Sequence, residues 1–224
     1  MDTNTGHRVV ELSHVIEHQM TTYPGLPGPE VSDHLSRGAS RQTYPSGTEF
    51  QIGRISLVAN TGTYLDAPFH RYPEGADLSA LDLSRLAHLP GVLVDATGRG
   101  RAIGPDAFAG HAVTDHAVLV RTGWDRHWRT AHYGAPEHPF LTIEAVAWLV
   151  AQRAALVGID SVNIDDMVDL RRPAHTGLLG AGIPIVEHLR GLDQLPDSGF
   201  RFHAAPAPVR GMGSFPIRAY AVVG

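Results

Sequence analysis

The sequence predicts a single α/β domain over residues 1–224, built on a mixed sheet with much irregular chain. Two observations support this prediction. A chain of 224 residues is long enough for one well-buried domain and short for two independent ones. Short apolar segments of strand type dominate, and one helical segment lies between two of them, which is typical of a βαβ unit in a sheet.

The strand candidates are short, apolar and bounded by turn residues. They cover residues 9–13, 50–59, 91–95, 117–121, 155–159 and 217–223. Helical spacing of apolar residues predicts a helix over 142–154, with Thr142 as its N-cap. A second, short helix is expected over residues 184–189. The segment 22–46 is rich in Pro, Gly and Ser, so we expect a long surface loop there that covers a site.

Composition excludes several classes of function. The chain has no cysteine, which rules out disulfides, thiolate nucleophiles and sulfur-based zinc sites. All eighteen basic residues are arginine and the net charge is −5, so we expect no nucleic-acid partner. No apolar run approaches the ~20 residues that span a bilayer, and no secretory signal opens the sequence. We therefore expect a cytoplasmic protein that does not bind membranes.

The eleven residues 60–70, NTGTYLDAPFH, are the most informative stretch. They follow an apolar strand candidate and combine polar groups, small residues and a proline, which suits a site better than a core. Asp66 and His70 lie four apart and can converge on one point in a tight turn. The alternative, in which Asp66 caps backbone amides and His70 is a surface residue, stays open.

A second cluster lies at residues 172–189, where a Gly-rich apolar passage separates His175 from Glu187. The neighbours of Glu187 are Ile185, Val186 and Leu189, so its carboxylate must be paired, metal-bound or protonated. Together, Asp66, His70, His175 and Glu187 would form a hard-ligand or acid–base group if the fold brings them together.

NTGTYLDAPFH resembles the signature of the cyclase family, His-x-Gly-Thr-His-x-Asp-Ala/Ser-Pro-x-His, with six of eight fixed positions intact. This family includes bacterial kynurenine formamidases, isatin hydrolases and certain polyketide cyclases. VVELSHVI, TTYPGLPGP, LVGIDSVNIDD, AHTGLLGAGIPIVEHL and GSFPIRAYAV resemble other family segments in the same order. The resemblance implies a swivelling β/β/α fold, a homodimer or higher homo-oligomer, and one or two divalent ions, commonly zinc or manganese. It also implies that Asp66, His70, His175 and Glu187 are metal-binding or catalytic.

Two positions depart from the signature, because Asn60 and Tyr64 stand where the family has histidine. An amide oxygen and a neutral phenol are poor zinc ligands compared with imidazole. The family's metal site should therefore be weakened, which leaves either one metal on Asp66, His70, His175 and Glu187 or none.

Three functions follow from this equipment. The one favoured by the sequence is metal-free acid–base cyclisation, dehydration or isomerisation of an aromatic or polyketide-like carbonyl compound in small-molecule biosynthesis, with His70 or Glu187 as base and Tyr64 and Asn60 orienting the carbonyl. The alternative is a single-metal amide or lactam hydrolase of the arylformamidase type, with Tyr64 as a hydrogen-bond donor to the developing oxyanion. A non-catalytic descendant that binds a small molecule is the third.

Several further residues are candidates for contacts with a small-molecule substrate. Tyr23 and Tyr44 flank the predicted loop, and Trp124 is a large aromatic residue near a strand end. Packing of Trp124 against the sheet and ordinary turn roles for the tyrosines remain open. Arg171 and Arg172 could meet an acidic substrate or pair with Asp169.

Overall fold

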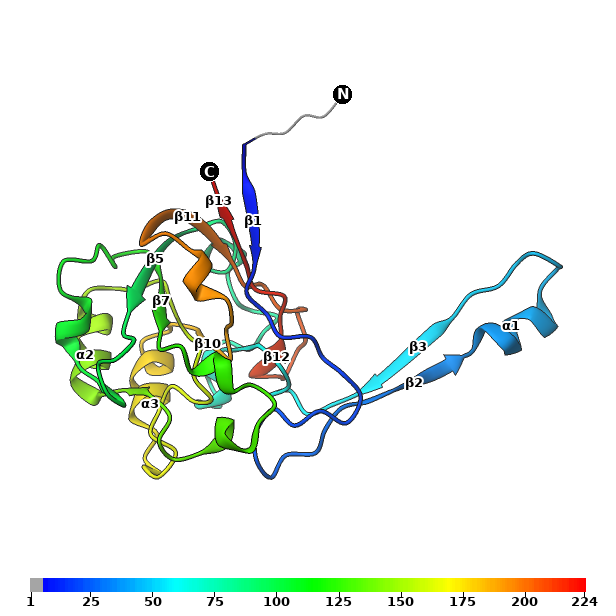
Figure 1. The fold of residues 1–224 in the computed structure, drawn as a ribbon, viewed down its shortest axis with the longest axis horizontal. Helices are drawn as coiled ribbons and strands as arrows, with labels where there is room; N and C mark the ends of the chain where they lie inside the picture. The colour runs from blue at the N-terminus through cyan, green and yellow to red at the C-terminus, as the bar shows by residue number, and fades with distance from the viewer. Residues whose placement is uncertain (1–5) are drawn as a thin grey trace.

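The computed structural model describes residues 6–224, and their main feature is a curled, nine-stranded mixed sheet (Figure 1). Its strand order is β1-β13-β11-β5-β7-β9-β10-β4-β12. The central pairs from β5 to β10 are parallel, whereas the flanking pairs are antiparallel. These strands are β1 (Arg8–Glu11), β4 (Tyr64–Asp66), β5 (Leu89–Asp95), β7 (Ala117–Arg121), β9 (Leu156–Ile159), β10 (Ile185–Glu187), β11 (Ser198–His203), β12 (Ser214–Pro216) and β13 (Tyr220–Val223).

Alternation along the central strands builds a separate core on each face of the sheet. Leu119 in β7 joins one core, whereas its neighbours Val118 and Val120 join the other. Leu156 and Val157 in β9 divide in the same way. Successive side chains of a strand point to opposite faces, so a strand that is apolar throughout must be covered on both sides.

Helices α2 (Ile143–Ala151) and α3 (Pro173–Gly180) pack together and against one of these cores. Thr142 caps α2 by accepting a hydrogen bond from the Ala145 amide, and α2 connects the parallel strands β7 and β9. The predicted βαβ unit and N-cap are therefore confirmed. A minor sheet pairs β6 (Ala102–Ile103) with β8 (Phe140–Leu141). Short 3₁₀ turns occupy Pro68–His70, Leu83–Arg85, Pro105–Phe108, Trp124–His127, Ala131–Gly134 and Leu192–Gln194.

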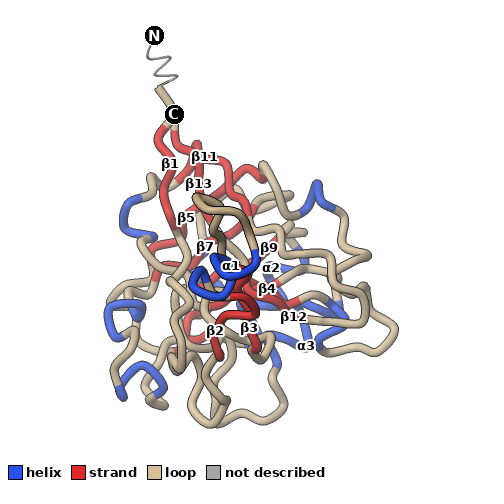
Figure 2. The backbone as a smooth tube through the Cα atoms, turned by 90° about the vertical axis from the view of Figure 1, so that its right-hand side faces the viewer, coloured by secondary structure: helices blue, strands red, loops and turns tan. Residues whose placement is uncertain are grey.

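A long arm projects from the body, and it contains much of the segment that the sequence predicted as a loop (Figure 1). The arm consists of β2 (Glu30–Leu35), α1 (Arg37–Thr43) and β3 (Ile52–Ser56), with β2 and β3 antiparallel. Figure 2 looks along it, with α1 in front of the body. The prediction of a structureless loop over 22–46 was wrong in this part, because Ser36 caps α1 and β-type residues pair across the hairpin.

Two other local predictions need correction. Residues 184–189 contain strand β10 and not a helix, because Val186 pairs with Gly158 on one side and Leu65 on the other. The predicted strand over 217–223 begins only at Tyr220. The predicted fold class, α/β with a mixed sheet of the swivelling β/β/α type, is confirmed by the arrangement and by the structural relatives described below. Within residues 6–224, no helix combines the length and apolar character needed to cross a membrane.

Candidate metal centre

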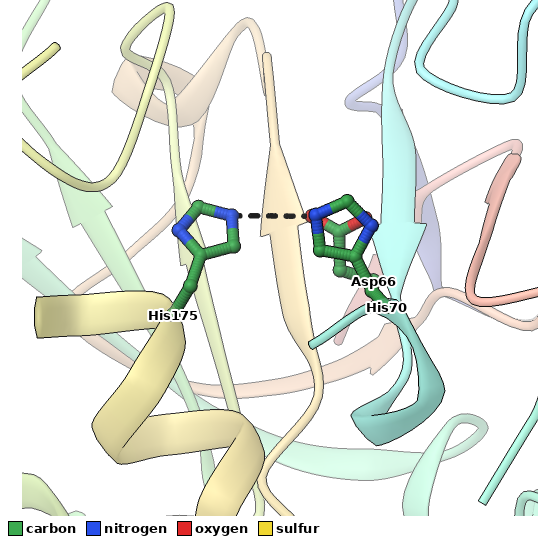
Figure 3. Close-up of side chains that lie close together, drawn as sticks. All are labelled: Asp66, His70 and His175. Atoms are coloured by element: carbon green, nitrogen blue, oxygen red, sulfur yellow. Dashed lines mark ion pairs between the residues drawn. The ribbon is translucent and has the colours of Figure 1, made fainter. Parts of the chain in front are cut away.

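Two segments that are far apart in sequence, residues 64–70 and helix α3, bring Asp66, His70 and His175 together (Figure 3). Asp66 ends β4, where it is paired with β10 and β12, and His70 ends the 3₁₀ turn that follows. His175 lies in the first turn of α3 and faces them across the site. One ligand-type atom from each residue lies within 4.8 Å of the others.

The carboxylate of Asp66 is fully buried, and its two oxygens differ in their surroundings. Oδ1 accepts a hydrogen bond from Ser214 Oγ, whereas Oδ2 has no hydrogen-bond partner among the described residues and lies 3.5 Å from His175 Nε2. Burial opposes ionisation of Asp66, but the nearby imidazoles of His175 and His70 and the hydrogen bond from Ser214 lower its pKa overall. Asp66 is thus an anion with one oxygen available to a ligand.

The ring of His175 is oriented by a second carboxylate. Its Nδ1 donates to Asp165 Oδ2 at 2.6 Å, and Asp165 also accepts from the backbone amides of Ala174 and His175. This arrangement fixes the proton on Nδ1 and directs Nε2 toward Asp66. Burial alone would lower the pKa of His175, but the charge of Glu187, the hydrogen bond to Asp165 and the nearby carboxylate of Asp66 raise it to about 9.

Ser214 connects Asp66 and His70 through its hydroxyl group. Its hydroxyl donates to Asp66, so its oxygen is free to accept from His70 Nδ1, which lies 2.9 Å away. Gly213 makes this approach possible, because a Cβ at that position would lie 2.3 Å from the His70 backbone nitrogen. Sequence reasoning missed both residues. The only available signal was their place in the GSFPIRAYAV segment, because nothing local links Ser214 to a histidine 144 residues away.

Glu187 and Tyr64 bind each other beside this group. Tyr64 donates its hydroxyl to Glu187 Oε2 at 2.5 Å, and the Ile164 amide donates to Oε1 at 2.6 Å. Burial, followed by the charges of Glu187 and Asp66, raises the pKa of Tyr64 well above its usual value, so the phenol remains a donor. Burial also raises the pKa of Glu187. Glu187 is therefore near the centre, with Oε1 3.8 Å from His175 Nε2, but both of its oxygens are already occupied.

A pocket of about 200 Å³ opens onto these groups. It is lined by Tyr23, Leu26, Asn60, Tyr64, His70, Asn163, Arg172 and His175. Tyr23 and Asn60, which the sequence analysis named as candidates, are among these residues, and their roles stay predictions.

Two expected substrate contacts are absent from this pocket in the isolated chain. Trp124 is buried in a separate cluster with Tyr133 and Val162, and its indole donates to the Tyr133 carbonyl. Tyr44 is the C-cap of α1 and lies on the projecting arm. A fully packed indole and a distant tyrosine cannot contact a ligand at Asp66 without movement or a second chain.

The donor set fits a divalent ion of the zinc or manganese type. Imidazole nitrogens and carboxylate oxygens are ligands for both metals, and the buried, unpartnered Oδ2 of Asp66 is a position that a cation would satisfy. The Asp165–His175 contact is the carboxylate–histidine arrangement that commonly supports a ligating imidazole. Asp66, His70 and His175 would hold the ion, and Glu187 would be a further ligand only if it released Tyr64 or Ile164.

Comparison with known proteins gives a consistent result. The family model for Cyclase matches residues 10–166. The kynurenine formamidase of Geobacillus thermodenitrificans is 28% identical over 221 residues, covering 94% of this chain and 95% of that protein. The kynurenine formamidase of Polaromonas naphthalenivorans is 26% identical, with coverage of 95% and 89%.

Solved structures share the fold over nearly the whole chain. Isatin hydrolase A from Labrenzia aggregata, bound to benzyl benzoate, superposes with a TM-score of 0.84 at 24% identity, covering 99% of this chain and 96% of that one. A structure described as a potential metal-dependent hydrolase with cyclase activity gives a TM-score of 0.80 at 25% identity, with coverage of 97% and 98%.

Proposed function

This chain belongs to the cyclase family of enzymes, and we propose that it is a divalent-metal-dependent hydrolase of a small amide or lactam. The observation that carries the proposal is the convergence of Asp66, His70 and His175 around an unpartnered carboxylate oxygen. Relatives whose names denote a formamidase and an isatin hydrolase support the same class of reaction.

The residues around the proposed metal site would have different roles in hydrolysis. A bound divalent ion supplies a lowered pKa for water and polarisation of a carbonyl, which together permit hydrolysis near pH 7. Asp165 and Ser214 hold the two imidazoles in one tautomer and orientation. The pocket beside Tyr23 and Leu26 excludes water from part of a small substrate.

Metal-free cyclisation, which the sequence favoured, has less support. It requires Tyr64 to orient a substrate carbonyl, whereas the Tyr64 hydroxyl donates to Glu187. Of the two bases expected, Glu187 has both oxygens accepting hydrogen bonds from Tyr64 and Ile164, which leaves only His70 for that role. The relatives named kynurenine formamidase and isatin hydrolase are named for hydrolytic reactions, which favours hydrolysis as the proposal.

Metal content tests the proposal directly. We expect untagged protein, analysed by inductively coupled plasma mass spectrometry, to retain about one zinc or manganese per chain after incubation and dialysis. Asp66→Asn should abolish binding, because it removes the anionic ligand. Asp115→Asn is the matched control, since Asp115 is exposed and pairs only with Arg153.

The enzyme assay uses formanilide as the amide and isatin as the lactam. Metal-dependent cleavage of either one supports the proposal. Absence of metal binding to the wild-type protein, even after incubation with both ions, would overturn it. Stoichiometric metal without cleavage of a wider amide and lactam panel would instead support the non-catalytic binding role.

Self-association is a second proposal, and it concerns the arm. Val31 and Ile55 are directly opposite each other on β2 and β3, and they are 47% and 53% exposed. A two-stranded hairpin is marginally stable by itself, and adjacent apolar side chains on it favour burial against another surface. A second copy of this chain is the partner that we infer, in keeping with the expected homodimer or higher homo-oligomer.

A further inference from the structure

Two adjacent arginines at the start of α3 differ in where their side chains lie. Arg171 is 87% exposed and pairs with Asp169 through two hydrogen bonds. Arg172 lines the pocket with His70 and His175, and its side chain is 35% exposed. The sequence left open whether these arginines meet a substrate or pair with Asp169, and the two alternatives apply to different residues.

The backbone at Arg172 is unusual and accounts for this difference. Its φ of 53° and ψ of 58° lie in the left-handed region, which is unfavourable for a non-glycine residue. Pro173 follows and begins the helix. The chain therefore turns at Arg172 in a strained conformation, and this turn carries the guanidinium to the pocket that contains the proposed metal ligands.

The guanidinium has donors that the protein does not use. Nε donates to Asp165 at 3.3 Å, and one terminal nitrogen, Nη2, lies 3.1 Å from both ring nitrogens of His175. Equal distances to both nitrogens describe a group lying over the ring and not a directed hydrogen bond. Nη1 has no hydrogen-bond acceptor in residues 6–224. A guanidinium presents five donors in a planar fork, so most of this fork is available to a ligand.

Nearby carboxylates occupy only one donor of Arg172. Glu187 accepts from Tyr64 and Ile164, and Asp165 accepts from His175, from two backbone amides and from Arg172 Nε, with which it forms an ion pair at 3.3 Å. The unpartnered oxygen of Asp66 lies toward His175 Nε2, within the proposed metal site. The pocket thus combines the proposed metal site with the Arg172 guanidinium, which retains free donors. Such a pocket suits a molecule that bears both a carbonyl and an anionic group.

We propose that Arg172 is a specificity-determining residue that binds the carboxylate of an anionic substrate, and this inference rests on the proposed hydrolase function. Because Nη2 contacts the His175 ring, the carboxylate must lie only a few bonds from the carbonyl that is cleaved. The volume of about 200 Å³ and the apolar contacts from Tyr23 and Leu26 fit a single ring. The substrate class is a small aromatic acid with an adjacent amide or lactam-type carbonyl.

The test compares 2-formamidobenzoate with formanilide, which share the ring and formamide and differ in the carboxylate. Binding is measured by calorimetry on the zinc-loaded protein and on the metal-free protein, and hydrolysis is measured separately. We expect the wild type to bind the anionic compound at least tenfold more tightly. Arg172→Gln should remove this preference, because it weakens binding of 2-formamidobenzoate at least tenfold more than binding of formanilide. Arg172→Lys should retain part of it, because a point charge replaces the fork.

Arg171→Gln is the matched control and should preserve the preference, since Arg171 faces solvent. Equal weakening of both compounds in Arg172→Gln would show that Arg172 only holds Asp165 and His175 in place, and it would overturn the inference. Absence of a preference in the wild type would also overturn it. Selective binding without hydrolysis would refute the hydrolase proposal and leave the role of Arg172 supported. If Arg172→Gln does not fold, Arg172→Lys and the wild-type preference still decide.

Discussion

At the scale of single residues, the decisive feature is what Tyr64 does in place of a histidine. Its phenol is 3% exposed and donates to Glu187 at 2.5 Å. The substitution therefore changes a ligand-type position into a hydrogen-bond donor that occupies the neighbouring carboxylate. The proposed metal ligands Asp66, His70 and His175 do not include either of the two altered positions.

Tyr64→Phe tests this role. We expect the free energy of unfolding to fall by about 1–3 kcal/mol, because a buried oxygen of Glu187 loses its donor. Urea unfolding monitored by circular dichroism measures the change. Tyr220→Phe is the control, since the Tyr220 ring stacks on His203. Equal stability of Tyr64→Phe and wild type would show that the Tyr64–Glu187 contact contributes nothing to the fold.

At the scale of elements, the arm is the segment least explained by the isolated chain. Every residue of β3 is exposed, and β2 is exposed up to Leu35. In the body, by contrast, the central strands are buried on both faces. An element with so little burial of its own needs a partner surface to be ordered.

A double substitution on the arm tests self-association. Val31→Asp with Ile55→Asp should convert a dimer or higher oligomer into a monomer, because two charges replace an apolar cross-strand pair. Size-exclusion chromatography with light scattering reports the mass. Ser32→Asp is the control, as Ser32 points to the other face of the hairpin. A wild-type protein that is monomeric at micromolar concentration would contradict the proposal.

At the scale of the whole molecule, buried histidines of opposite character set the response to pH. Burial first, and then nearby Arg190 and Arg129, lower the pKa of His14 to about 3. Burial also lowers the pKa of His188 to about 3. His175 is the reverse case, with a pKa of about 9.

In the metal-free protein these three histidines favour a stability maximum near pH 6.5. Asp160 opposes the acid limb, because burial raises its pKa to about 7 and the stability of its protonated form is lost as pH rises toward that value. Below about pH 6.5 the unfolded chain binds protons that folded His14 and His188 refuse, so stability falls between pH 6.5 and 3 by at most about 1.4 kcal/mol per pH unit for each. Above it, the stability supplied by protonated His175 is lost as pH rises toward 9. Urea unfolding from pH 4 to 9 measures both limbs.

His14→Phe isolates one contribution. The His14 and Trp128 rings are stacked, with their centroids 3.9 Å apart. Phenylalanine keeps an aromatic ring in this position and removes the group that titrates. Below pH 6.5, the slope of the unfolding free energy against pH should decrease by the equivalent of up to one proton. Above pH 6.5, the slope should not change. An unchanged acid slope would show that His14 is protonated in the folded protein.

The sequence alone determined the class of fold and most of the site's composition. Alternating apolar strands and a capped amphipathic helix predicted the βαβ centre, because these patterns are local and report burial directly. Asp66, His70 and His175 stood out because polar residues in apolar or turn-rich surroundings must have partners. The family resemblance rested on the same segments.

Only the tertiary structure decided how these residues are joined. β4, β10 and β12 are three residues long, too short for a periodic pattern, and they form because neighbouring strands supply their hydrogen bonds. Ser214 reaches His70, and Tyr64 reaches Glu187, across more than a hundred residues of sequence. Such contacts depend on strand register and chain packing, which no local pattern encodes, so the course of the arm and the inward turn of Arg172 also became visible only in the folded chain.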